Sequence, residues 1–128
     1  MRQEQAQYQT ISDKVAWKSL QNLIERFHFQ PEEGRILMGD MPRSTYFKGL
    51  QEHQGKLSRD HKERISYLLG IYKALRILFT DSHQATTWIE RANDLPPFNG
   101  MTPKQFLLEG SLVRLSDVRR FLDFWRGY

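Results

Sequence analysis

The segment from Ser58 to Phe79, SRDHKERISYLLGIYKALRILF, constrains the fold more than any other part of the chain. Ser58 stands where an N-cap is expected, and Asp60 follows in the first turn, where the helix dipole favours an anion. Its apolar residues form a face that widens until the helix is apolar on most sides: Ile65, Leu68, Leu69, Tyr72, Leu75, Leu78 and Phe79. A helix of this kind has to be surrounded, so we expect it at the centre of the molecule, with Gly70 permitting the close approach of a neighbouring helix.

Two shorter helices are predicted before this segment. Residues 11–29 carry apolar side chains on one helical face: Ala16, Leu20, Leu23, Ile24 and Phe27. Residues 30–39 predict a short helix that begins at Pro31, because proline is tolerated in the first helical turn, and stops at Gly39.

A third helix is predicted within residues 40–57, starting near Ser44 or Thr45, packing inward through Phe47 and Leu50 and stopping at Gly55. Three short helices with a Gly-Asp turn between the last two are typical of a helix-turn-helix. In that interpretation the third helix reads DNA from its first turns through Arg43, Ser44, Thr45 and Lys48. The alternative is a helical corner that binds nothing. It stays open because residues 1–57 hold eight Lys or Arg against seven Asp or Glu and therefore carry little of the positive charge that DNA binding favours.

The second half predicts a helix over 83–93, a proline-rich loop, a restart at Thr102-Pro103 that ends at Gly110, and a last helix capped by Ser116. We expect the loop to fix the angle between the helices on its two sides. The last helix places four residues on one apolar face: Val118, Phe121, Leu122 and Trp125. In this interpretation three charged residues face elsewhere: Arg119, Arg120 and Asp123. The apolar face either completes the core or offers a plug to a partner.

Composition excludes several classes of function. The absence of cysteine excludes disulfides, thiolate zinc sites and cysteine nucleophiles. The four histidines are scattered and no catalytic or phosphate-binding motif occurs, so we expect no enzymatic activity, no metal and no cofactor. No apolar run reaches the length of a membrane span and the first residues lack the apolar centre of a signal peptide, which predicts a cytoplasmic protein. The net charge of +4 favours a mixed-charge surface over a dedicated phosphate-binding face.

Three ordered stretches of the second half resemble a known family: LSRDHKERISYLLGIYKALRILF, WIERANDLPPFNGMTPKQFLLEG and LSDVRRFLDFWRG. In this order they are similar to the toxin-binding domain of the Xre/MbcA/ParS antitoxins, and the resemblance covers residues 57–128. The N-terminal half resembles, in outline, the Xre-like helix-turn-helix that usually precedes this domain. The family pattern falls on Asn93, Pro97, Phe98, Gly100, Pro103, Gly110, Val118, Arg119, Leu122, Asp123, Arg126 and Gly127.

The resemblance implies an all-α antitoxin of a bacterial type II toxin-antitoxin pair. It divides the chain into a flexible tail (1–10), a helix-turn-helix-like domain (11–57) and a toxin-binding domain (58–128). The implied partner is a RES-domain toxin that consumes NAD, bound in a hetero-oligomeric complex that contains an antitoxin homodimer or a higher oligomer.

The implied mechanism is a block of the toxin's active-site pocket, with autoregulation of the operon through contact between the helix-turn-helix and operator DNA. The residues expected to bind the toxin are Asn93, Phe98, Arg114, Arg119, Arg120, Asp123, Arg126, Gly127 and Tyr128. The alternative function is that of a DNA-binding transcriptional regulator without a toxin partner.

Overall fold

The computed structural model describes residues 11–127, so the predicted tail (1–10) and Tyr128 lie outside the described residues. Within 11–127 the fold is all-α, as predicted, and contains no strand. The helices are α2 (Asp13–Arg26), α3 (Pro31–Leu37), α4 (Arg43–Glu52), α5 (Arg59–Leu78), α6 (Ser82–Thr87), the 3-10 helix η1 (Trp88–Glu90), α7 (Pro103–Leu107) and α8 (Leu112–Trp125).

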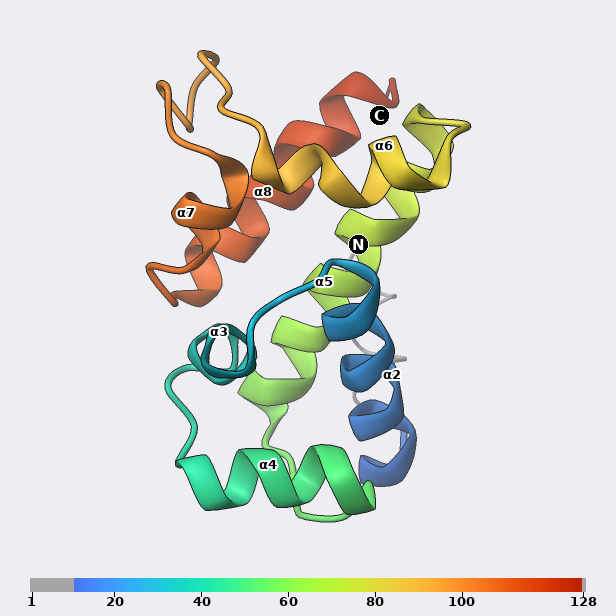
Figure 1. Ribbon diagram of the computed structural model, residues 1–128, viewed down its shortest axis with the longest axis vertical. Coiled ribbons are helices and arrows are strands. Elements are labelled where there is room, and N and C mark those ends of the chain that lie inside the picture. The colour runs from blue at the N-terminus through green and yellow to red at the C-terminus, as the bar shows by residue number, and fades with distance from the viewer. Residues whose placement is uncertain (1–10, 128) are drawn as a thin grey trace.

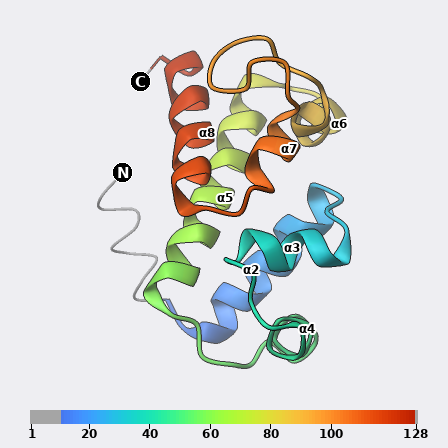
Figure 2. The ribbon, with the colours of Figure 1, turned by 90° about the vertical axis from the view of Figure 1, so that its left-hand side faces the viewer.

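Helix α5 runs through the centre of the molecule, and the other helices gather around it (Figure 1). Helix α2 packs beside its N-terminal part and α4 packs on α2, whereas α8 runs alongside its C-terminal part in the same direction (Figure 2). One hydrophobic core joins both halves and includes Leu20, Leu37, Ile65, Leu75 and Leu122. The central position predicted from the wide apolar face of α5 is therefore confirmed.

Side-chain caps fix where several helices begin. The Ser58 Oγ accepts a hydrogen bond of 3.1 Å from the backbone N–H of His61 at the start of α5. The Thr102 Oγ1 accepts one of 3.0 Å from Gln105, and Pro103 follows as the first residue of α7. Each cap satisfies a backbone donor that the first helical turn leaves unpaired. The starts predicted at Ser58 and at Thr102-Pro103 are confirmed.

Three predicted helix boundaries are wrong. Helix α8 is capped by Ser111, whose Oγ accepts a hydrogen bond of 3.3 Å from Arg114, and not by Ser116. The helix predicted over 83–93 is shorter, because α6 ends at Thr87 and a 3-10 turn follows. Helix α4 ends before Gly55, because His53 already adopts a left-handed conformation with φ of 54°. Residue spacing alone could not decide whether Ser111 or Ser116 caps α8, or at which residue the other two helices end.

The inward face of α4 also differs from the prediction. Phe47 and Leu50 are only half-buried, whereas Tyr46 is fully buried and packs edge-on against Trp17 of α2. Helices α2 and α4 approach closely because Gly49 has no side chain, and a Cβ there would collide with the Trp17 ring. The indole Nε1 of Trp17 donates a hydrogen bond of 2.8 Å to the carbonyl of Gly55, which holds the end of the α4 segment against α2.

A buried guanidinium ties the two halves of the chain together. Arg64 of α5 donates hydrogen bonds to the carbonyls of Leu37, at 3.0 Å, and of Gly110, at 2.6 Å. Leu37 ends α3 and Gly110 follows α7, so one cation satisfies carbonyls near the C-terminal ends of two helices, where the helix dipole also favours positive charge. Its charge is balanced by Asp60, whose Oδ2 lies 2.8 Å from the Arg64 Nε.

Helices α5 and α8 interlock at Gly70. A Cβ at this position would collide with the guanidinium of Arg119, which occupies the space that a side chain would fill. The Arg119 Nε lies 3.2 Å from each carboxylate oxygen of Asp123, one turn later on α8, and both residues are buried. The close approach predicted at Gly70 is confirmed. The group that approaches Gly70 is the Arg119 guanidinium, which belongs to a buried ion pair.

Gly70→Ala should lower the free energy of unfolding by about 2 to 3 kcal/mol, although alanine is the better helix former by about 1 kcal/mol. The added methyl group displaces a buried cation from its carboxylate, which outweighs the gain in helix propensity. Denaturant unfolding monitored by circular dichroism measures the change.

The control is the same substitution in a chain that carries Arg119→Ala, where the collision no longer exists. There Gly70→Ala should be neutral or stabilising by up to about 1 kcal/mol. Equal destabilisation in both backgrounds would show that Arg119 is not the cause.

Candidate functional site

Asn93 closes the proline-rich loop, which connects η1 to α7. The backbone N–H of Asn93 donates to the carbonyl of Met101 at 3.1 Å, and its own carbonyl accepts from Gly100 at 2.8 Å. Its side-chain Oδ1 accepts a third hydrogen bond, of 2.9 Å, from the backbone N–H of Leu95. Asn93 therefore acts on the shape of the loop, whose return is completed by Gly100 with φ of 97°.

Phe98 anchors the tip of this loop in the core. It is 1% exposed, and its ring packs edge-on against Trp88, Phe106 and Phe121 at centroid separations of 5.8, 5.3 and 5.1 Å. These rings come from η1, α7 and α8, so the loop is pinned to three separate elements. Phe98 is therefore a core residue, and its side chain is not exposed for contact with a partner.

An apolar surface forms where α5 and α8 both end. Leu78 is 37% exposed, Leu95 47% and Trp125 54%, and all three line one hollow of about 320 Å³. We call these three residues the end surface. It lies next to Arg126 and Gly127, the last residues that the structure describes. Contiguous apolar side chains left in water usually mark an interaction site.

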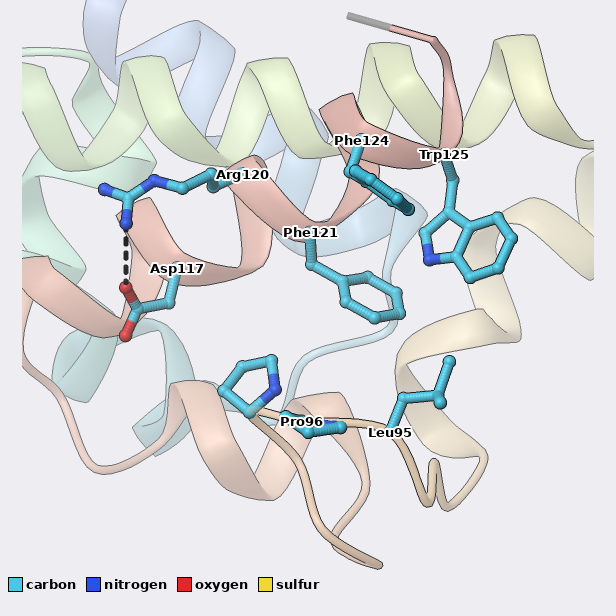
Figure 3. A pocket seen from close by; sticks show the side chains of 8 residues that line it. Leu95, Pro96, Asp117, Arg120, Phe121, Phe124 and Trp125 are labelled. Carbon is cyan, nitrogen blue, oxygen red and sulfur yellow. Dashed lines mark ion pairs between the residues drawn. The ribbon is translucent and has the colours of Figure 1, made fainter.

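A larger groove runs between the loop and α8, with a volume of about 570 Å³. Figure 3 shows Leu95 and Pro96 on one side of it, facing Phe121, and the ion pair between Asp117 and Arg120 at one end. Its lining residues are Leu95, Pro96, Pro97, Asp117, Arg120, Phe121, Phe124 and Trp125. The groove is apolar apart from that ion pair.

Several predicted toxin-binding residues are held inside the domain. Arg119 and Asp123 were expected to face away from the apolar side of α8, and this expectation is wrong, because both are buried against α5. The Arg126 side chain is also largely covered, with its Nη1 3.5 Å from the Asp123 Oδ1. Arginine reaches the inward face because glycine at position 70 leaves room and Asp123 supplies the counter-charge, neither of which is visible in the periodicity of α8 alone.

The other predicted toxin-binding residues are distributed around the second half. The guanidinium of Arg114 stacks on the Phe106 ring with 4.2 Å to its centroid. Arg120 is exposed and lies 3.9 Å from Asp117. Gly127 is exposed with φ of 91°, and Tyr128 lies outside the described residues. The predicted set therefore does not form a single patch.

Sequence reasoning missed the exposed aromatic residues of α8. Trp125 was assigned to the apolar face together with Val118 and Leu122, yet it is 54% exposed, and Phe124 is 72% exposed. Phe124 could have been found in the sequence, because it lies on the same helical face as Asp117 and Arg120, which is polar and therefore turned to solvent. Leu95 carried no such signal, because its exposure is set by the path of the loop.

The predicted DNA-reading residues share the N-terminal part of α4. Arg43, Ser44, Thr45 and Lys48 are all exposed, and α4 lies at the end of the molecule farthest from α6 and the end of α8 (Figure 1). Helix α3, a five-residue turn over 38–42 and α4 give the order of elements of a helix-turn-helix.

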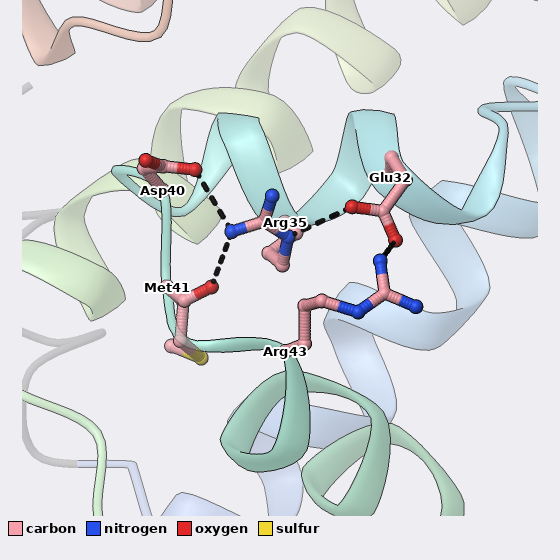
Figure 4. Close-up of polar contacts among 5 residues, drawn as sticks. All are labelled: Glu32, Arg35, Asp40, Met41 and Arg43. Carbon is pink, nitrogen blue, oxygen red and sulfur yellow. Dashed lines mark hydrogen bonds and ion pairs between the residues drawn. The ribbon is translucent and has the colours of Figure 1, made fainter.

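A polar network fixes the turn between α3 and α4 (Figure 4). The Arg35 Nη1 donates to the Asp40 Oδ1 at 2.8 Å and to the carbonyl of Met41 at 3.0 Å, and its Nε lies 3.1 Å from the Glu32 Oε1. The other carboxylate oxygen of Glu32 pairs with Arg43. Partial desolvation raises the pKa of Glu32, but hydrogen bonds from Arg35 and Arg43 and their positive charges outweigh it, and the pKa falls below its ordinary value.

Within residues 11–127 no group of three or more histidine, aspartate or glutamate side chains is arranged to hold a metal ion. In the same part of the chain, no helix combines the length and apolar character needed to cross a membrane.

Comparison with known proteins gives a family and one relative. The family described as the antitoxin Xre-like helix-turn-helix domain matches residues 6–70. The uncharacterized protein y4oB of Sinorhizobium fredii (strain NBRC 101917 / NGR234) is 39% identical over 105 residues, which cover 82% of this chain and 79% of the relative. No solved structure matches the chain.

Glu32→Gln should destabilise the protein at neutral pH, because an amide is a weaker partner for the two arginines than a carboxylate. The folded-state pKa of Glu32 is lowered, so its contribution to stability is fully present above the ordinary value of 4.5 and is lost as the pH falls through the lowered pKa. Melting temperatures of the two proteins should therefore differ at pH 7 and converge toward pH 3. Glu25→Gln, on the exposed face of α2, is the control, and an unchanged gap between wild type and Glu32→Gln at low pH would contradict the assignment.

Proposed function

We propose that this chain, which belongs to the antitoxin Xre-like helix-turn-helix domain family, is the antitoxin of a type II pair and neutralises a RES-domain toxin that consumes NAD. Membership of the family implies a toxin partner and DNA binding in general. The identity of the toxin follows from the resemblance of residues 57–128 to the toxin-binding domain. Antitoxins of this kind act by binding, so we assign the chain no catalytic residue and no cofactor.

The end surface is the observation that carries this proposal. It places Leu78, Leu95 and Trp125 in water at the point where α5 and α8 end together. Aromatic anchors of this kind dominate the energetics of many protein interfaces. The loop that carries Leu95 is held rigidly by Asn93 and Phe98, so the surface is preorganised and little ordering entropy opposes binding.

The proposed blocking group is the segment that follows Trp125. NAD offers its binding site an adenine, so a site built for NAD accepts an aromatic ring in place of the base, and a guanidinium pairs with acidic groups in the toxin pocket. Arg126 and Tyr128 provide these two groups on either side of Gly127, and the Arg126 guanidinium has to leave Asp123 to reach the toxin pocket. In this scheme the end surface provides affinity, and the residues after it enter the toxin pocket.

The helix-turn-helix half supports autoregulation of the operon. Arg43, Ser44, Thr45 and Lys48 are exposed together on α4, as direct reading of DNA requires. A single helix-turn-helix of this size usually binds as a dimer to two half-sites about 34 Å apart. DNA binding by a regulator without a toxin partner would use the same helix but would leave the end surface without a function.

Removal of residues 126–128 should leave a folded protein that still binds the toxin but no longer protects cells. Of the described residues, the deletion removes Arg126 and Gly127, which are not part of the hydrophobic core, and it takes away the proposed blocking group. Co-expression with the toxin should lower cellular NAD and stop growth, whereas co-purification of the two proteins should persist. If the shortened chain protects cells as well as the full chain, the block lies elsewhere.

Trp125→Ala should instead weaken the complex itself, by about 2 kcal/mol or more if Trp125 is a central anchor. Titration calorimetry with an inactive toxin variant measures the affinity. Val15→Ala is the matched control, because Val15 is 47% exposed and lies on α2, outside the end surface. An unchanged affinity for Trp125→Ala would exclude the end surface from the toxin interface.

Operator binding should depend on α4. Replacing Arg43 and Lys48 together by alanine should weaken binding to the operator and reduce its salt dependence, because two phosphate or base contacts are lost. The toxin-antitoxin complex is titrated with operator DNA at low salt, and Lys14→Ala plus Lys18→Ala is the control of equal charge. Equal binding by the α4 variant and wild type would exclude α4 as the reading helix.

A further inference from the structure

Arg43 is held in place by two contacts that come from different elements. Its Nη1 pairs with the Glu32 Oε2 in the first turn of α3 (Figure 4). Its guanidinium carbon also lies 5.3 Å from the centre of the Phe47 ring, one turn later on α4. The Arg43 side chain is nevertheless 66% exposed. A long side chain at an exposed helix start has many rotamers, and these two contacts restrict them.

Glu32 is itself fixed by the polar network of the turn. Its second oxygen, Oε1, accepts a hydrogen bond of 3.1 Å from the Arg35 Nε. The Arg35 Nη1 in turn holds the carboxylate of Asp40 and the carbonyl of Met41. A continuous series of contacts therefore runs from the turn through Arg35 and Glu32 to Arg43. One exposed ion pair restricts little, whereas a connected network of charges fixes the geometry of its members.

We propose that Glu32 is a positioning residue for DNA recognition, which orients the Arg43 guanidinium toward the edge of a guanine. The inference rests on the proposed operator binding through α4 and names the base that this contact selects. The contact with Glu32 uses Nη1, so the edge formed by Nε and Nη2 is the one that can meet a base. Two parallel donors match the O6 and N7 acceptors of guanine in the major groove.

The charge of this half of the chain favours a base contact over a phosphate contact. Residues 1–57 hold eight Lys or Arg against seven Asp or Glu, so attraction to phosphates alone provides little affinity. Glu32 also cancels the charge of Arg43, which weakens the attraction of this arginine to any phosphate. Phosphate contacts carry no sequence information, whereas base contacts do. A neutral pair in a fixed orientation therefore lowers general affinity for DNA and increases discrimination between sequences.

The experiment is a double-mutant cycle on DNA binding by the full chain: wild type, Glu32→Gln, Arg43→Ala and the double variant. Each protein is titrated with two duplexes of equal length, one with the sequence upstream of its own gene and one with the same bases in scrambled order. In Glu32→Gln the ratio of the two affinities should fall about tenfold, which is within the discrimination of one bidentate base contact.

The salt dependence gives a second readout, which a loss of stability alone would not produce. In Glu32→Gln the released Arg43 can reach a phosphate, so affinity for the scrambled duplex should rise. The slope of log affinity against log salt concentration should become steeper by about 0.9, the value for one added phosphate contact. Glu52→Gln is the control of equal charge, because Glu52 is exposed at the opposite end of α4, and it should leave the ratio of affinities unchanged.

The Arg43→Ala background tests whether Glu32 acts through Arg43. There the ratio of affinities is already low, and Glu32→Gln should not lower it further. Loss of the contact with Arg35 is common to both backgrounds, so an equal fall of the ratio in both would make Glu32 a structural residue and overturn the inference. Arg43→Lys should lose the ratio as alanine does, because an ammonium has no planar pair of donors. A lysine variant that keeps the ratio would also overturn it.

Failure of this inference differs from failure of operator binding. If Arg43→Ala lowers the ratio of affinities but Glu32→Gln leaves it at the wild-type value, α4 reads DNA without help from Glu32, and only the positioning role is lost. If wild type and Arg43→Ala both bind the two duplexes equally, Arg43 reads no base. That result would overturn the proposed operator contact of Arg43 and the inference together.

Discussion

The guanidinium of Arg119 lies in the space that a side chain at position 70 would fill, and its Nε is 3.2 Å from both carboxylate oxygens of Asp123. Both groups lie on α8 and are buried, so the ion pair turns with the helix, and the rotation of α8 against α5 is instead set by the guanidinium, which fits only where Gly70 leaves room. The rotation of α8 decides which residues face water. The glycine at 70 and the ion pair on α8 therefore determine that Phe124 points outward and that Trp125 lies at the end of the domain.

Helix α5 gives the two proposed activities a common frame. Its first part packs against the helix-turn-helix half, its last part packs against α8, and Arg64 joins carbonyls from both sides. Helix α4 and the end of α8 consequently lie at opposite ends of the molecule (Figure 1). In one chain, a toxin at the end surface and DNA at α4 would therefore not compete for the same residues.

The sequence predicted the features that depend on local chemistry. Ser58 and Thr102 were identified as caps because capping requires only a side-chain oxygen near a helical start, and the role of Gly70 follows from its place in a wide apolar face. The burial of Arg119 could not be predicted, because it depends on a glycine 49 positions away in the chain. The exposure of Trp125 likewise depends on where α5 ends beside it, so both errors concern contacts between distant segments.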